Sequence, residues 1–150
     1  MIQEIDFDNR TGKILDHLML QYTADAIHAA CALFSFDAGY QVSVSYVGAE
    51  EIRTLNAQYR NVDAVTDVLS FPMEDTDERG VALLGDVVLC VDRAAEQATE
   101  FGHSLQREIC YLSVHSVLHL MGYDHEEDDE KSEMRRLEKQ IMAELRIFKE

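Results

Sequence analysis

The sequence predicts a single α+β domain over residues 1–150, in which a mixed sheet of about four strands packs with about five helices. The length of 150 residues suits one domain with one core. Apolar residues form 47% of the chain and charged residues 28%, a balance typical of globular rather than disordered proteins. Strand-like and helix-like segments follow each other without strict alternation, which favours a mixed sheet over a parallel one.

Four segments carry strand patterns. Apolar and serine residues alternate over 42–46, which is the period-two pattern of a half-buried strand. A weaker alternation over 2–7 indicates a short first strand. The β-branched run over 84–91 predicts a central strand. Residues 68–71 are followed by Pro72, so we expect this strand to end there or to lie at a sheet edge.

Five segments have the spacing or the capping residues of helices, and they are residues 13–34, 49–59, 92–99, 104–122 and 128–147. Asp92 and Ser104 are expected to be N-caps, because their side-chain oxygens can accept a hydrogen bond from the first turn. Gly102 and Gly122 are expected to end the helices that precede them. An acidic loop is expected over 73–80.

The net charge constrains the partners of the protein. The chain has 29 acidic residues against 13 Lys and Arg, which gives a formal charge of −16. Such a charge repels a polyanion at long range and argues against indiscriminate nucleic-acid binding. Charges farther apart than about 8 Å are largely screened at physiological salt, so a local basic position can still hold a phosphate.

The N-terminal residues and the cysteines indicate a cytoplasmic protein. Residues 1–6 contain acids where a secretory signal has a basic region, and no apolar stretch approaches the roughly 20 residues that span a bilayer. Cys31, Cys90 and Cys110 are odd in number, widely spaced and without a C-x-x-C pair, which argues against disulfides and thiolate metal sites. We therefore expect no membrane partner and three buried free cysteines.

Three histidines near the end of the fourth predicted helix form the most informative motif. His115 and His119 are four residues apart, so on a helix their imidazoles lie on one face, about 6 Å apart along the axis. Gly122 can take a left-handed conformation and reverse the chain, which would bring His125 back toward the same point. We therefore predict that one zinc ion is held by these three histidines, because three ligands with an open fourth position form a catalytic zinc site.

The spacing of the histidines matches that of metzincin peptidases, but the residue after the first histidine does not. Metzincins carry Glu there as the general base, and this chain carries Ser116. A hydroxyl with no base beside it cannot accept a proton from zinc-bound water near neutral pH. The peptidase reading is therefore disfavoured, although it remains an alternative.

Four blocks in one order resemble the YbeY family of bacterial endoribonucleases that mature ribosomal RNA. The blocks lie within residues 50–145 and comprise Asn56 to Arg60 with Asp63, Thr66 to Pro72, Leu84 to Cys90, and Tyr111 to His125. The one departure noticed is Ser116, where the family usually has Gly. A small residue is retained there, so close packing of the helix is still expected.

The resemblance implies a single-strand-specific, metal-dependent endoribonuclease that trims precursor ribosomal RNA, notably at the 3′ end of the small-subunit RNA, and assists ribosome quality control. It implies partners among the small ribosomal subunit or its associated factors, and no DNA substrate. The family's metal ligands correspond to His115, His119 and His125, and its catalytic arginine corresponds to Arg60. From the residues alone, the favoured interpretation of Arg60 is a cation near a helix end, where it is favourable with the helix dipole, and the resemblance reverses this preference.

Four further polar residues remain open. A metal-bound histidine usually donates its second N–H to a carboxylate or carbonyl, and Asp86 or Asp124 could serve as that partner. Ser70 and Thr66 are expected to form the wall of a groove beside the metal.

Two other functions stay in view. One is a metallopeptidase, and the other is a non-catalytic module in which zinc stabilises the loop around Gly122 while the protein binds ribosomal components.

Overall fold

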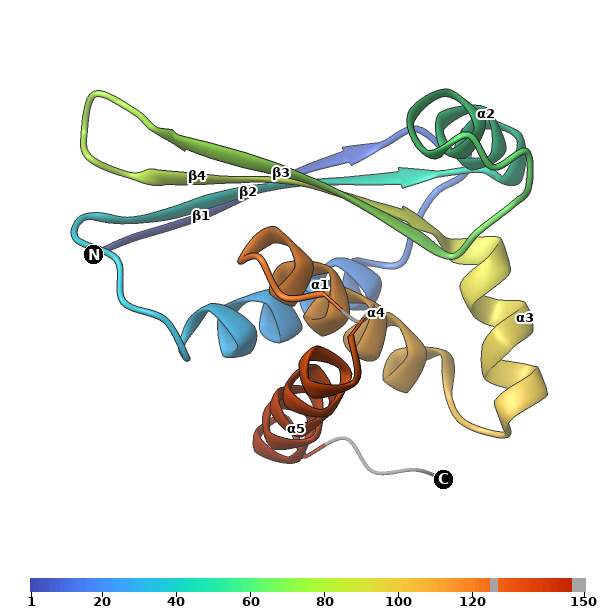
Figure 1. Cartoon of the computed structure of the whole chain (residues 1–150). Coiled ribbons are helices and arrows are strands. Elements are labelled where there is room, and N and C mark those ends of the chain that lie inside the picture. Colours follow the sequence, from blue (N-terminus) through green and yellow to red (C-terminus); the bar gives the residue numbers. More distant parts are fainter. Residues whose placement is uncertain (125–126, 147–150) are drawn as a thin grey trace.

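The computed structural model describes residues 1–124 and 127–146 and shows a single α+β domain built on one mixed sheet (Figure 1). The strands are β1 (Ile2–Asn9), β2 (Gly39–Val47), β3 (Val68–Thr76) and β4 (Ala82–Cys90), in the spatial order β1-β2-β4-β3. Neighbours β1, β2 and β4 are parallel, and β3 pairs antiparallel with β4. The predicted fold class is confirmed, as is the central position of the strand over 84–91.

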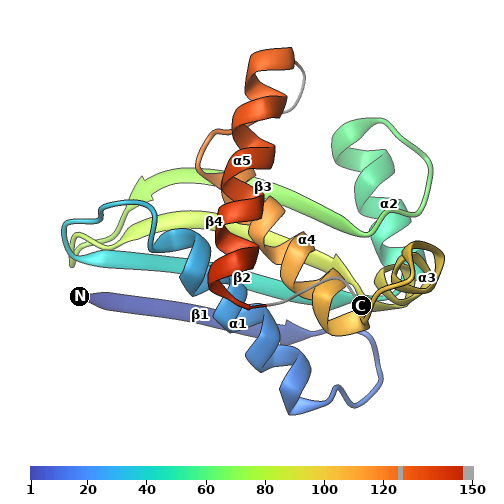
Figure 2. The same cartoon turned by 90° about the horizontal axis from the view of Figure 1, so that it is seen from below.

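Helices cover the two faces of the sheet unequally. Helices α1 (His17–Cys31), α4 (Leu105–Leu120) and α5 (Asp128–Glu144) lie on one face, with α5 crossing over α4 (Figure 2). Helix α2 (Ala49–Arg60) lies on the opposite face at one end of the sheet, and α3 (Val91–Phe101) stands beside that end. The main core lies between the sheet and α1, α4 and α5, and a smaller apolar cluster lies beneath α2.

Helix α4 is the central helix of the covered face. It begins where predicted, because the Oγ of Ser104 accepts a hydrogen bond from the backbone N–H of Arg107 at 3.1 Å. It ends at Leu120, and Gly122 follows with a φ of +94°, a conformation that favours glycine. Ten of its residues are buried, so the helix packs on nearly all sides and its polar positions are held firmly.

The edge strand β3 corrects one expectation and confirms another. It lies at the sheet edge, as Pro72 predicts. However, it continues through the proline to Thr76, so the first residues of the loop expected over 73–80 belong to the strand. The register shifts between Pro72 and Asp75. Gly85 of β4 faces this point with a φ of +130°, and a Cβ there would lie 2.1 Å from the carbonyl oxygen of Phe71. The close approach of the two backbones therefore requires glycine.

The observed ends of helices α3 and α5 agree only in part with the expected ones. Gly102 caps α3 in the left-handed conformation with a φ of 70°, as predicted. Asp92 was expected as the N-cap of α3, but the N-cap is Cys90, two residues earlier, and Asp92 lies in the first turn. An acid there still interacts favourably with the helix dipole. Helix α5 ends at Glu144, short of the expected Ile147, which lies outside the described residues.

Two further expectations concern the cysteines and membrane-spanning segments. All three cysteines are free and buried, as predicted. Burial raises the pKa of the Cys31 and Cys110 thiols to about 12, so both are poor nucleophiles near neutral pH. Within residues 1–124 and 127–146, none of the helices combines the length and the apolar character needed to cross a bilayer.

Candidate functional site

A polar pocket of about 490 Å³ lies where the end of α2, the edge strand β3 and helix α4 meet. Its lining residues are Arg60, Thr66, Asp67, Val68, Leu69, Ser70, Pro72, Tyr111, Leu112, His115, His119 and Asp124. The pocket therefore brings together residues from three of the four blocks of the sequence motif. Thr66 and Ser70 lie in its wall, as expected.

The imidazoles of His115 and His119 converge at this pocket. Their Nε2 atoms are 3.1 Å apart, and their rings meet edge to face with centroids 4.6 Å apart. The helical spacing predicted this convergence. Residue His125, the third expected ligand, lies outside the described residues.

The distance between the two nitrogens is close to the distance that one zinc ion requires. Two nitrogens that are each about 2.0 to 2.1 Å from one tetrahedral zinc lie about 3.3 to 3.4 Å apart. The observed 3.1 Å differs from this by a few tenths of an ångström. The donor set present therefore fits a zinc ion.

A buried carboxylate from α5 stands behind His115. The Oε2 of Glu138 lies 2.7 Å from the Nδ1 of His115, and Glu138 is only 6% exposed. An ionised carboxylate can only accept a hydrogen bond, so the ring hydrogen is assigned to Nδ1. The Nε2 atom that faces His119 then keeps its lone pair, which is the form that binds a metal.

Sequence reasoning missed Glu138 and named two aspartates for its role. Asp86 is exposed on the sheet and is not among the residues that line the pocket, whereas Asp124 is among them. Glu138 lies between the buried residues Leu137 and Ile141, on the apolar face of α5. An acid on the apolar face of an amphipathic helix was the signal that could have identified it.

Tyr111 packs against the same pair. Its ring stacks on His115 with centroids 5.9 Å apart and an interplanar angle of 29°. Burial, and next the negative charge of Glu138, raise the pKa of Tyr111 above its ordinary range. The phenol is therefore neutral at physiological pH, and its ring limits the rotation of the His115 imidazole.

Arg60 lines the pocket from the end of α2. It is the last residue of α2, and the next residue, Asn61, turns the chain with a left-handed φ of 60°. The side chain of Asn56 braces the segment that follows, because its Nδ2 donates to the carbonyl of Ala64 at 2.9 Å. The helix end and this brace together direct residues 60–67 along the pocket rim.

Ser116 faces β3 instead of the open pocket. It is fully buried, and its Oγ lies 2.5 Å from the Oγ of Ser70. The hydroxyl pair joins α4 to the edge strand. The position that carries the general base in metzincins therefore serves helix packing here.

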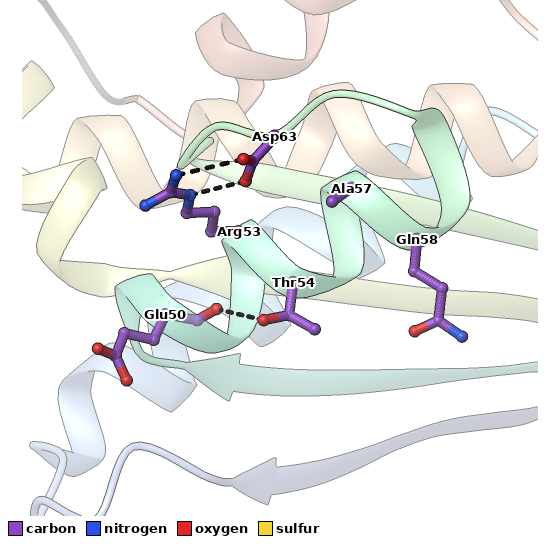
Figure 3. A pocket seen from close by; sticks show the side chains of 6 residues that line it. All are labelled: Glu50, Arg53, Thr54, Ala57, Gln58 and Asp63. Atoms are coloured by element: carbon purple, nitrogen blue, oxygen red, sulfur yellow. Dashed lines mark hydrogen bonds and ion pairs between the residues drawn. The ribbon is translucent and has the colours of Figure 1, made fainter.

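A second hollow, of about 630 Å³, lies on the outer side of α2 (Figure 3). It is the larger of the two, and its lining includes an ion pair in which the Nε of Arg53 donates to the Oδ1 of Asp63 at 2.8 Å. This pair lowers the pKa of Asp63 and ties the segment after α2 back to the helix. The side chains of Glu50 and Gln58 point away from this ion pair (Figure 3). We assign this hollow to the structure of the α2 end, because its lining residues within the described part of the chain include no imidazole.

The fold and the first pocket together define a class of α+β proteins in which an imidazole pair and an arginine face one pocket at the edge of a mixed sheet. The sequence model of the family described as "Endoribonuclease YbeY" matches residues 4–146. The chain belongs to this family.

Individual relatives agree with the family match. The chain is 49% identical over 114 residues to an "Endoribonuclease YbeY" of Finegoldia magna, with 76% of this chain and 74% of that protein covered. It is 41% identical over 152 residues to a protein of the same name from Clostridioides difficile, with 98% and 99% covered. A solution structure of a Thermotoga maritima protein superposes with a TM-score of 0.59 at 27% identity, with 95% of this chain and 91% of that one covered.

Proposed function

We propose that this chain is a metal-dependent endoribonuclease that cuts single-stranded RNA in the maturation of ribosomal RNA, with residues 1–150 forming one such domain. The name of its family and of its relatives supports a hydrolase that acts on RNA. The observation that carries the proposal is the convergence of His115 and His119 in the pocket that Arg60 also lines.

The proposed ligands of one zinc ion are His115, His119 and His125. Among residues 1–124 and 127–146, no three His, Cys, Asp or Glu side chains form a group that could hold a metal. The first two ligands are supported by the separation of their Nε2 atoms, and the third is assigned from the motif and the resemblance. When bound, the ion supplies electrophilic stabilisation of a phosphoryl oxygen.

The protein's own residues have distinct tasks in the proposed reaction. Arg60 binds the nonbridging oxygens of the phosphate, because a guanidinium stays charged and offers a planar fork of donors. The negative charge on these oxygens grows in the transition state, so Arg60 stabilises it more than the ground state. Glu138 keeps the hydrogen of His115 on Nδ1, and Tyr111 holds the plane of that ring.

The substrate and the cellular setting are proposed from the family resemblance. They are the 3′ end of small-subunit precursor RNA, a part in ribosome quality control, and contact with the small subunit or its associated factors. A ribosomal substrate agrees with a cytoplasmic protein.

The experiment that tests this function compares one RNA sequence in two states. Zinc-loaded protein is incubated with a labelled single-stranded oligonucleotide and with the same oligonucleotide annealed to its complement. Internal cleavage of the single strand, loss of cleavage after chelation and recovery on adding zinc are expected. Equal cleavage by chelated protein would refute a metal-dependent nuclease.

The two alternative functions give different results in simple assays. A metallopeptidase would digest casein in a zinc-dependent way, which the buried position of Ser116 disfavours. A module that zinc only stabilises would lose much of its melting temperature on chelation and would cut no RNA. The proposed nuclease is expected to keep its fold, because apolar side chains of the sheet, α1, α4 and α5 make up its main core.

A further inference from the structure

Exposed apolar side chains occur along residues 59–73, the stretch that borders the histidine pocket and is here called the rim. Tyr59, Val62, Val65 and Met73 are exposed by 61%, 43%, 40% and 47%. All four come from the end of α2, the segment that follows it and β3, the same part of the chain that supplies Arg60 to the pocket. Apolar side chains that cluster at a site, unlike single scattered ones, mark a surface that binds something.

Tyr59 is the anchor of this rim. Its ring meets that of Phe71 edge to face, with centroids 5.2 Å apart and an interplanar angle of 69°. The neighbours of Phe71 in β3, Ser70 and Pro72, line the pocket. Successive strand residues point to opposite faces, so Tyr59 lies beside the edge strand on the face away from Ser70 and Pro72. It is next in sequence to Arg60 and mostly open to solvent.

The charges around the rim do not suit a backbone-binding surface. Arg60 is the single Lys or Arg in the stretch 59–73. The acids of that stretch are Asp63, which pairs with Arg53, and Asp67, whose Oδ1 accepts from the backbone N–H of Val68 at 2.7 Å. Outside this stretch, Arg135 of α5 acts electrostatically on Tyr111 of the pocket. With a formal charge of −16 over the whole chain, we expect few phosphates to be held at the rim and the bases to carry much of the binding.

We propose that Tyr59 stacks on an unpaired base of the RNA next to the phosphate held by Arg60, with Val62, Val65 and Met73 covering the neighbouring base. This proposal rests on the proposed function. Aromatic stacking tolerates any base sequence, because every base has a π face. A paired base is already stacked within its helix, so the rim selects single strands without reading their sequence.

Binding and cleavage are measured separately to test the proposal. Anisotropy of a labelled single-stranded oligonucleotide gives binding by zinc-free protein, and initial rates give kcat and KM for the zinc-loaded protein. Tyr59→Ala is expected to weaken binding and raise KM by roughly 5- to 150-fold, with kcat, zinc content and melting temperature little changed. Tyr59→Trp should bind at least as well as the wild type.

The matched control is Phe101→Ala, because Phe101 is 56% exposed at the end of α3 and is not among the residues that line the pocket. It should bind RNA as the wild type does. A second probe replaces single bases of the oligonucleotide by abasic sites. At one position the abasic site should weaken wild-type binding and leave Tyr59→Ala unaffected, as expected for two groups that stack on each other.

Salt dependence gives an independent measure. With one or two phosphate contacts, the slope of log binding constant against log salt is expected to be about −0.7 to −1.4. A slope steeper than about −3 would mean that phosphates dominate binding and would overturn the proposal. Wild-type RNA affinity in Tyr59→Ala would overturn the proposal as well. That result is expected if the rim binds a protein instead of RNA. RNA that binds through Tyr59 but is never cut would refute the proposed function and leave the stacking site standing.

Discussion

Two histidine–glutamate pairs are attached to helix α4, and they differ in what surrounds them. At its start, the Nε2 of His103 lies 2.6 Å from the Oε1 of Glu108, with side chains 12% and 3% exposed. Further along, the Nδ1 of His115 lies 2.7 Å from the Oε2 of Glu138, with side chains 23% and 8% exposed. The two distances differ by 0.1 Å, and the side chains of the first pair are the more buried.

The surroundings separate a structural pair from a functional one. His103 and Glu108 are five residues apart and tie the first turn of α4 to the chain before it. The pair of His115 and Glu138 instead joins two helices, and the other nitrogen of His115 faces His119. A buried carboxylate on an imidazole is thus common to both, and what marks the site is a second imidazole that converges on the same point.

Loss of a ligand should produce the largest effect. His119→Ala is expected to lose bound zinc and essentially all RNA cleavage, because a three-ligand site has no spare donor. His103→Ala should keep its full zinc content. Metal analysis of tag-free protein together with the cleavage rate provides the measurement, and zinc retained in His119→Ala would show that the convergent pair is as structural as the other.

The arginine should come next. Arg60→Ala is expected to lower kcat roughly 10²- to 10³-fold with zinc content and melting temperature nearly unchanged, because one preorganised donor to the phosphate is lost. Arg53→Ala is the matched control, since Arg53 pairs with Asp63 and does not line the histidine pocket. Both variants are assayed on single-stranded RNA at fixed salt. A wild-type rate in Arg60→Ala would show that Arg60 has no part in cleavage and is only a cation at a helix end.

The carboxylate behind the site should have a smaller effect. Glu138→Gln is expected to weaken zinc binding about 10- to 100-fold, because the amide no longer fixes the hydrogen of His115 on Nδ1 as firmly. Competition with a zinc chelator measures this affinity without any assay of RNA cleavage. Glu108→Gln should bind zinc as the wild type does, and equal losses in the two variants would remove the distinction between the pairs.

The smallest effect on function is expected at the other pair. Glu108→Gln should lower the free energy of unfolding by about 1 to 3 kcal/mol, because an exchange at a site only 2% exposed leaves the hydrogen bond to His103 poorly satisfied. Urea unfolding measures this change, and kcat should stay at the wild-type value. A change in kcat without a change in stability would place this pair in the reaction as well.

Local patterns predicted the elements that local physics controls. The alternation over 42–46 predicted β2, and Ser104 caps α4 as expected. The spacing of His115 and His119 predicted that their imidazoles converge. The passage of β3 through Pro72 was missed, because it depends on the close approach of Gly85 from another strand.

The site shows the same limit. Glu138 is 23 residues from His115, and an acid on a helix is read from sequence as solvent-facing unless the packing partner is known. The role of Arg60 was assigned from the family resemblance. The residues next to it in the sequence do not distinguish an arginine that binds phosphate from a cation at a helix end. The role of His125 stays a prediction.

The bond between α4 and α5 also sets an order of events during translation. The two imidazoles leave the ribosome before Glu138 does, so a nascent chain that has exposed α4 still lacks the group that orients His115. The proposed zinc site would then reach its full affinity only when α5 has emerged and docked. A nuclease proposed to act on ribosomal RNA would thereby be kept weak while it is still being synthesised by a ribosome.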